Sequence, residues 1–458
     1  MSETRQDRRW TRMFAEHGVL VASLIKWTLL AAAVGVLAGV GTAIFLRTLD
    51  WAIGEMAGAP WRLLWLPPGF VAAHLLVRVL APDAEGHGTD KVIEAVHQRS
   101  GRIALAVAPI KLAATVITIG VGGSVGKEGP AAQIGASLAS GLSSLLRLHR
   151  RDRRKVVICG IGAGFATVFG TPIAGAIFGL EVLVLGSLMY DVLYPSFVAG
   201  IVGYHVASQL GVRYFHHALP ALPAPSNRMF LDTLLAGVVF GVVAILLIEA
   251  LRWTHRLAHR IPVPGWVIAA AGGTVVALGA WLTSDRYLGL GLSTLEASIR
   301  GEPVPPDAAL LKILFTAVSL GTGGSGGIVT PIFFVGATAG SALAHWGGLD
   351  PAMFSAIGMV ALLAGAANAP LAASVMAIEL FGPAIGPFAA IAAIVAFIMS
   401  GHRSVYPSQV LGMPKTGSLR LQPGVELDGQ AEIDARRARL RWRAFRRSLR
   451  ALRRRPRD

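Results

Sequence analysis

Apolar runs fill the chain from Leu20 to Met399, and glycine or proline interrupts most of them after roughly 12–17 residues. An α-helix rises about 1.5 Å per residue, so such a run falls short of the ~30 Å hydrocarbon core unless the helix is tilted or broken. The pattern therefore predicts a polytopic membrane protein made of many short helices.

The pattern repeats. The run IKLAATVITIGVGGSVGKEGP begins at Ile110, and the similar run LKILFTAVSLGTGGSGGIVTP begins at Leu311. Lys111 is matched by Lys312 at a constant offset of 201 residues. Two similar membrane halves are typical of transporter folds. We predict an all-α polytopic membrane protein with two inverted-topology repeats of short, tilted and broken helices.

The repeats divide the chain into five predicted segments. They are a cytoplasmic N-terminal segment (1–30), a first membrane repeat (31–217), a linker (218–228), a second membrane repeat (229–406) and a basic cytoplasmic tail (407–458).

Composition agrees with a membrane protein. Hydrophobic residues make up 53% of the chain and charged residues only 15%, too few charges for a soluble protein of this length. The single cysteine, Cys159, excludes an internal disulfide and suggests no metal cluster. We expect neither a metal nor a cofactor.

Positive charge is concentrated outside the apolar runs. Twelve arginines follow Asp434, and a basic loop spans residues 147–155. Basic flanks tend to stay in the cytoplasm, so we expect both termini and this loop to be cytoplasmic in a plasma (inner) membrane. The arginine-rich tail is expected to lie on anionic lipid rather than to bind nucleic acid.

Glycine-rich breaks occupy matching places in the two halves, at 122–130 and 321–331. Pro130 and Pro331 suit the first turn of a helix, so both breaks predict helix N-termini. Such ends present unpaired N–H groups and partial positive charge, and two of them converging in the membrane would hold an anion. The alternative is that the glycines only allow close helix packing.

The first break also holds a charged pair, Lys127 and Glu128. Ionisable residues at membrane depth are costly, and they usually have a function. A carboxylate at a helix N-terminus competes with an incoming anion for the same positive potential. Protonation would neutralise the carboxylate, so Glu128 is predicted to gate an anion path and to link anion occupancy to proton binding.

Other classes fit less well. A phosphate loop fails because Val121 replaces its first glycine and Glu128 its hydroxyl residue. An intramembrane serine protease, with Ser325 as nucleophile, is a distant alternative, because the other half carries the same serine at Ser124 and no histidine is an obvious base. Helix N-termini would repel a cation. The residues favour anion transport, in which no bond is broken, so the protein is not expected to be an enzyme.

The motifs GHG (86–88), GKEGP (126–130), GGIVTP (326–331) and SVYPSQ (404–409) occur in this order on a doubled scaffold. Together they resemble the CLC family of chloride channels and proton-coupled chloride exchangers, over residues 30–410. The resemblance implies a homodimer with one anion path per subunit, Glu128 as the gating glutamate and protons as possible coupling ions. It also implies an anion-binding set of His87, Gly88, Gly126, Lys127, Glu128, Gly129, Gly327, Ile328, Val329 and Tyr406.

Three departures from the family pattern affect the expected ion and mechanism. His87 replaces the serine that usually contacts the anion, and Val329 with Thr330 replaces an aromatic motif. A fluoride-selective subgroup departs at the same places, so fluoride, or another halide or nitrate, is the alternative to chloride, which the presence of Tyr406 favours. Val182 replaces the second acid of proton-coupled members. This leaves a channel and an exchanger with another proton path both open.

Three further residues are secondary candidates for the anion path. They are Lys111, which could raise anion affinity, Glu181 and Thr330.

Overall fold

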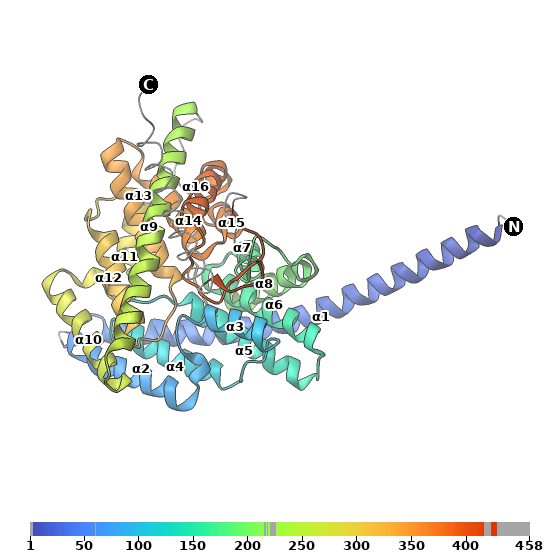
Figure 1. The fold of residues 1–458 in the computed structure, drawn as a ribbon, viewed down its shortest axis with the longest axis horizontal. Helices are drawn as coiled ribbons and strands as arrows, with labels where there is room; N and C mark the ends of the chain where they lie inside the picture. Colours follow the sequence, from blue (N-terminus) through green and yellow to red (C-terminus); the bar gives the residue numbers. More distant parts are fainter. Residues whose placement is uncertain are drawn as a thin grey trace, which may run out of the picture.

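Sixteen α-helices and one two-stranded sheet make up the part of the chain that this computed structural model describes (Figure 1). The described residues are 3–59, 61–214, 217, 219, 226–415 and 423–427, and for residues 3–15 only the helical backbone is described.

Eight helices form the first repeat: α1 (Glu3–Met56), α2 (Leu66–Leu80), α3 (Thr89–Gln98), α4 (Val107–Gly120), α5 (Glu128–Leu145), α6 (Arg150–Phe169), α7 (Pro172–Glu181) and α8 (Tyr190–Gln209). Eight form the second: α9 (Asn227–Arg260), α10 (Gly265–Leu282), α11 (Leu292–Ile299), α12 (Ala308–Gly321), α13 (Val329–Gly347), α14 (Pro351–Ala367), α15 (Pro370–Phe381) and α16 (Gly386–Met399). The strands β1 (Val184–Leu185) and β2 (Val410–Leu411) pair in parallel.

The helix boundaries confirm the internal repeat. Helices α4 and α12 begin and end 201 residues apart, and α5 and α13 begin at the same offset. Four helices, within residues 16–56, 62–80, 227–260 and 265–282, are long and apolar enough to cross a membrane. Six further apolar helices, or helix pairs joined by a tight turn, have only 10–17 residues, as the sequence pattern predicted.

The glycine-rich breaks join the two repeats. Gly126 and Gly327 exchange two backbone hydrogen bonds, each with an N···O distance of 2.6 Å. These N–H groups are therefore not available to an anion in this conformation, contrary to the expectation from the sequence. Their pairing instead places the starts of α5 and α13 side by side.

Side-chain hydroxyl groups also join the two repeats, close to the backbone bridge between Gly126 and Gly327. The Ser124 hydroxyl lies 3.1 Å from that of Thr316 in α12, and the Ser325 hydroxyl lies 3.4 Å from that of Thr115 in α4. Each serine of one break thus contacts the helix before the break of the other repeat. This symmetric role explains both serines without a nucleophile, and it argues against the protease alternative.

Two glutamates cap helices of the opposite repeat. Glu181, at the end of α7, accepts hydrogen bonds from Leu371 N at 3.0 Å and Ala372 N at 2.8 Å, in the first turn of α15. Glu379, in α15, accepts bonds of the same lengths from Ile173 N and Ala174 N of α7. Each carboxylate satisfies N–H groups at a positive helix end. Glu181 therefore holds two helices together.

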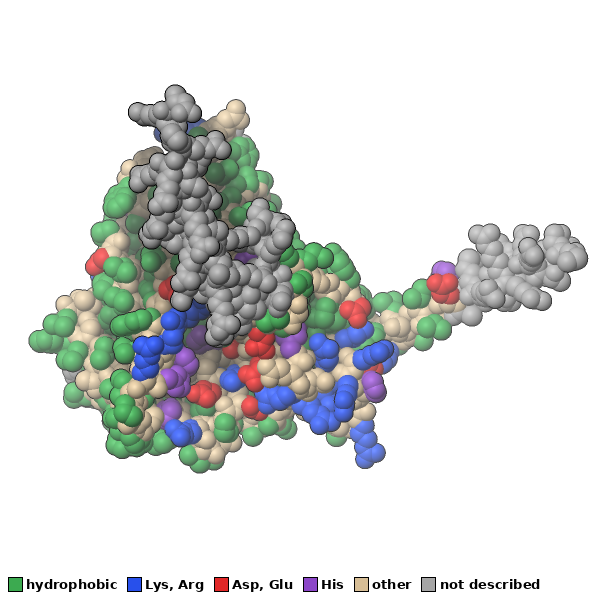
Figure 2. Space-filling model, in the orientation of Figure 1, with side chains coloured by type: hydrophobic (Ala, Val, Ile, Leu, Met, Phe, Trp, Pro, Cys, Tyr) green, Lys and Arg blue, Asp and Glu red, His purple; other side chains and the backbone are tan. Residues whose placement is uncertain are grey.

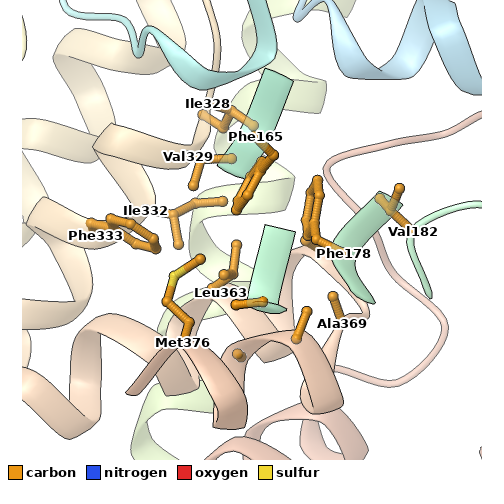
Figure 3. Close-up of a cluster of buried hydrophobic side chains, with 14 of the residues drawn as sticks. Phe165, Phe178, Val182, Ile328, Val329, Ile332, Phe333, Leu363, Ala369 and Met376 are labelled. Atoms are coloured by element: carbon orange, nitrogen blue, oxygen red, sulfur yellow. The ribbon is translucent and has the colours of Figure 1, made fainter. Parts of the chain in front are cut away.

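An apolar cluster fills the space between the repeats (Figure 3). It combines Phe165 and Phe178, whose rings stack with centroids 4.0 Å apart, with Val182, Val329 and Phe333, among others. Val182, where the family pattern has an acid, is fully buried in this cluster. Charge at that position would lack solvent and partners.

The segments at the two outer repeat boundaries are continuous with the helical body in the described residues. Helix α1 continues through residue 30 without a break. Residues 404–413 pack into the body, where Gln409 donates hydrogen bonds to Val182 O and Ala367 O. The arginine-rich part of the predicted tail lies outside the described residues.

The reciprocal caps generate a stability prediction. Replacing Glu181 with Ala removes two hydrogen bonds to a carboxylate, each contributing about 1.5–3 kcal/mol, and leaves the N–H groups of Leu371 and of the buried Ala372 without this acceptor. We expect a clearly lower apparent unfolding temperature in detergent, and a smaller decrease for Glu181→Gln, which keeps one acceptor. Glu302→Ala is the matched control, because Glu302 forms an exposed ion pair with Arg300 that contributes little. Equal unfolding temperatures for Glu181→Ala and Glu302→Ala would contradict the capping role.

Candidate functional site

Three helix N-termini meet at the junction of the repeats, those of α3, α5 and α13. Gly88 precedes α3, and a β-carbon added to it would lie 2.5 Å from Gly129 O, in the first turn of α5. A β-carbon on Gly327, just before α13, would lie 2.8 Å from Gly129 N. Only glycine allows backbones to approach this closely. Since each helix start carries partial positive charge, their convergence favours an anion.

Glu128 lies at this junction with no exposed surface (0%). One of its carboxylate oxygens accepts a hydrogen bond from Thr330 N at 2.9 Å, and the other accepts one from the Thr330 hydroxyl at 2.5 Å. The carboxylate of α5 thus caps the start of α13, in the opposite repeat. It occupies the kind of position that a bound anion would take.

Tyr406 and Thr89 supply hydroxyl groups beside this position. Both side chains are buried, and neither hydroxyl forms a hydrogen bond that meets normal geometry in the described part of the chain. The Tyr406 hydroxyl interacts with the Thr89 hydroxyl and experiences the charges of Glu128 and Asp90. Buried hydroxyls normally have a partner. Since Thr89 is the first residue of α3, its hydroxyl belongs to one of the three helix starts.

Thr89 also lies at this junction, although the sequence pattern did not single it out. It directly follows the GHG motif and is the first residue of α3. A hydroxyl in the first turn of a helix that starts at a glycine break is the signal that could have identified it.

His87 lies one residue before Gly88, and its imidazole is close to the Val405 backbone, next to Tyr406. It is only partly buried. His87 thus lies beside the residue that precedes Tyr406, and its place in the anion path remains a prediction.

Lys111 has a positioning role. Its fully buried ammonium group donates hydrogen bonds to Ala84 O at 3.0 Å and Gly86 O at 2.7 Å, which holds the loop that leads to His87. Lys312 makes the equivalent bonds to Tyr287 O and Gly289 O. Lys111 therefore fixes the loop before His87, and a role of Lys111 in anion affinity remains a prediction.

Three other residues of the predicted anion-binding set are Lys127, Ile328 and Val329. Lys127 is the N-cap residue of α5 and is partly buried. Ile328 and Val329 are fully buried, and Figure 3 shows their side chains in the apolar cluster. These two residues can contact an anion only through their backbones.

A family model described as "Voltage gated chloride channel" matches residues 69–401. The chain belongs to this family, the CLC proteins. A relative from Pseudomonas syringae pv. tomato named "Chloride/fluoride channel protein" is 40% identical over 403 residues, which is 86% of this chain and 89% of the relative. The voltage-gated ClC-type chloride channel ClcB of Salmonella typhimurium is 29% identical over 84% of this chain and 98% of its own length.

Solved structures have the same fold. A CLC-type fluoride/proton antiporter superposes with a TM-score of 0.80 at 31% identity, covering 85% of this chain and 98% of that one. A slow cyanobacterial Cl⁻/H⁺ antiporter gives a TM-score of 0.72 at 20% identity over 82% and 94% of the two chains, which shows the fold alone. This CLC protein is therefore a multi-pass membrane protein that transports an anion, as a channel or as a proton-coupled exchanger.

The contact between Glu128 and Thr330 yields a prediction about gating. Thr330→Val removes the hydrogen bond from the Thr330 hydroxyl that helps to hold the Glu128 carboxylate in place. A hydrogen bond to a charged group contributes about 1.5–3 kcal/mol, which changes an equilibrium constant by about tenfold or more. Anion efflux from liposomes at neutral pH should therefore rise, while Thr330→Ser, which keeps the hydroxyl, should behave like the unmodified protein. A Thr330→Val protein with unchanged efflux at every pH would show that the bond does not restrain the gate.

Proposed function

We propose that this CLC protein exchanges a small monovalent halide for protons, with Glu128 as the group that both ions use. The observation that carries the proposal is the position of the Glu128 carboxylate. It is fully buried, and it caps the start of α13 in the opposite repeat.

The competition between carboxylate and anion has a simple electrostatic cause. Both are attracted to the same partial positive charges, and both accept hydrogen bonds from the same kinds of donor. An incoming anion therefore displaces ionised Glu128, and displaced Glu128 is more easily protonated because it has lost its donors. Binding of the anion and binding of the proton become linked free energies.

The resemblance to CLC proteins predicts chloride as the transported ion, because Tyr406 is present. Fluoride is a second candidate with a specific observation in its favour. The solved structure at 31% identity is a fluoride/proton antiporter, and the relative at 40% identity carries fluoride in its name. The apolar Val329 and the Thr330 hydroxyl beside Glu128 also depart from the common chloride pattern.

We further propose that the face carrying α3 and the 147–155 loop is cytoplasmic. Figure 2 shows Lys and Arg side chains gathered over the region where Figure 1 places α3, α5 and α6. Gly101, just after α3, packs against the Arg154 backbone, so both features lie on the same side. Basic residues favour the cytoplasmic side. This orientation in an inner membrane, the homodimer and contact of the C-terminal tail with anionic lipid remain part of the proposal.

The direct test is ion flux by the purified protein in liposomes. With an outward chloride or fluoride gradient, ion-selective electrodes record the anion while a pH electrode records protons. We expect the efflux of at least one of the two ions to drive protons inward against their own gradient. Efflux without proton movement for both ions would reject exchange and leave a channel. A clear flux of only one halide would decide between the candidates.

A further inference from the structure

The predicted anion ligand Tyr406 lies in an irregular segment, residues 400–409, between the end of α16 and the strand β2. Its side chain is fully buried, and its hydroxyl has no hydrogen-bond partner of normal geometry. A hydroxyl can point at a ligand only if the backbone that carries it is fixed. Because this segment belongs to no helix and no sheet, side-chain contacts must fix it.

Short-range contacts determine the shape of the segment around Tyr406. The Ser404 hydroxyl accepts a hydrogen bond from Tyr406 N at 2.9 Å, a turn that serine forms with the residue two positions on. Pro407 follows the tyrosine and restricts its backbone to extended conformations. Gln409 N then donates a bond to Tyr406 O at 3.2 Å. The tyrosine therefore lies in a tight turn, which needs attachment to the rest of the protein.

The side chain of Gln409 attaches this turn to the ends of two helices. It is fully buried, and its nitrogen donates hydrogen bonds to Val182 O at 2.8 Å and Ala367 O at 2.9 Å. Val182 directly follows α7, and Ala367 is the last residue of α14. Carbonyl groups at a helix C-terminus lack a partner within the helix and carry partial negative charge, so they are good acceptors for a side-chain donor.

The carbonyl oxygen of the same side chain also forms two bonds. It accepts one from the Ser404 hydroxyl at 2.6 Å and one from the Asn368 side-chain nitrogen at 3.0 Å. The Ser404 hydroxyl thus donates to Gln409 while it accepts from Tyr406 N, which links the glutamine to the tyrosine backbone. The Gln409 amide makes four hydrogen bonds in all, two as donor and two as acceptor.

A carboxamide is the side-chain group that suits this place. Two carbonyl acceptors need two N–H donors, two further donors need an acceptor oxygen, and glutamine offers both on one planar group. Glutamate would set a carboxylate against the carbonyl oxygens of Val182 and Ala367. Methionine has a similar length, but it would leave all four partners without their bond.

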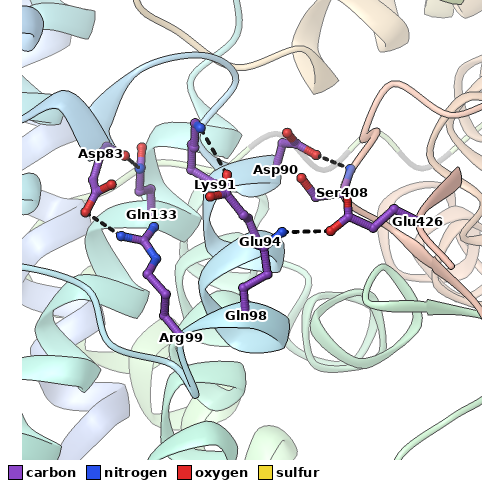
Figure 4. A network of polar contacts seen from close by, with 9 residues as sticks. All are labelled: Asp83, Asp90, Lys91, Glu94, Gln98, Arg99, Gln133, Ser408 and Glu426. Atoms are coloured by element: carbon purple, nitrogen blue, oxygen red, sulfur yellow. Dashed lines mark hydrogen bonds and ion pairs between the residues drawn. The ribbon is translucent and has the colours of Figure 1, made fainter. Parts of the chain in front are cut away.

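The turn is also attached to the junction of the helix starts. Ser408 N donates a hydrogen bond to a carboxylate oxygen of Asp90 at 2.9 Å (Figure 4). Asp90 lies in the first turn of α3, one of the three helices that begin at the junction. Tyr406 is therefore held between the start of α3 on one side and the ends of α7 and α14, through Gln409, on the other.

We propose that Gln409 is a positioning residue for anion binding, which holds the Tyr406 hydroxyl in the direction of the anion. The inference rests on the contact between Tyr406 and the anion that the resemblance predicts. Without the Gln409 bonds, the tyrosine must be ordered again each time an anion binds, and this cost weakens binding. The bond from Val405 N to Ala366 O at 2.9 Å would still hold the preceding residue, so the path of the chain would persist.

The rival role for Gln409 is general stabilisation of the fold, and a double-substitution cycle with Tyr406→Phe separates the two roles. Tyr406→Phe removes only the hydroxyl, whereas Gln409→Met removes the four bonds of the amide. If Gln409 acts through the hydroxyl, the second substitution adds nothing to the first. Gln98→Met is the matched control, because Gln98 is exposed and its side chain donates to Glu426, away from the turn.

The experiment measures chloride and fluoride binding to the purified full-length variants by titration calorimetry. We expect Gln409→Met and Tyr406→Phe each to weaken binding of at least one halide by about tenfold. The double variant should bind within about twofold of either single variant, and Gln98→Met should bind like the unmodified protein. Unchanged affinity in a folded Gln409→Met protein would overturn the inference. A double variant whose loss equals the product of the two single losses would overturn it as well.

The outcomes separate this inference from the proposed exchange. Tyr406→Phe with the affinity of the unmodified protein for both halides would reject the tyrosine, and Gln409 with it, while leaving the exchange intact. An unmodified protein that moves no protons in liposomes would reject the exchange but not this inference, because calorimetry measures binding without flux.

Ser404→Ala decides if Gln409→Met does not give a monodisperse protein. It cuts the link between Gln409 and Tyr406 N but keeps the bonds of the amide to the ends of α7 and α14. We expect it to weaken halide binding when Tyr406 is present and to have no effect in the Tyr406→Phe protein. An equal effect in both proteins, or none in either, would overturn the inference.

Discussion

The hydrogen bonds between Glu128 and the start of α13 determine the rest of the site. They place a carboxylate from one repeat on the positive helix end of the other, where a transported anion would otherwise bind. The close glycine contacts between the helix starts make this geometry possible. A site built in this way holds an anion by helix dipoles and N–H groups, without a full positive charge that would bind it too tightly to release.

The same principle recurs through the molecule as contacts between opposite repeats. The Gly126–Gly327 bridge, the hydroxyl pairs of Ser124 and Ser325, and the caps formed by Glu181 and Glu379 each join the two halves. A polar group in a membrane protein needs a partner inside the protein. In this fold, broken helices of one repeat find partners in the other, and we propose the anion site at the junction of the starts of α3, α5 and α13.

The repeat, the breaks and the starts of α5 and α13 could be predicted from the sequence, because glycine and proline act locally and the two halves can be aligned. The contact between Glu128 and Thr330 could not, since it joins residues 202 positions apart and depends on which helix ends meet. The same limit applies to the backbone bonds between Gly126 and Gly327, which join residues 201 positions apart. It also explains why Thr89, an ordinary threonine by sequence, was overlooked.

The central claim is that one carboxylate serves both ions, and Glu128→Gln tests it most directly. Glutamine has nearly the same shape, but it is neutral and cannot carry the proton. Measured in liposomes with anion and pH electrodes together, this variant should transport the anion at an equal or higher rate, with no dependence on external pH and no proton movement. Loss of anion transport in a correctly folded Glu128→Gln protein, or proton movement that persists in it, would contradict the account.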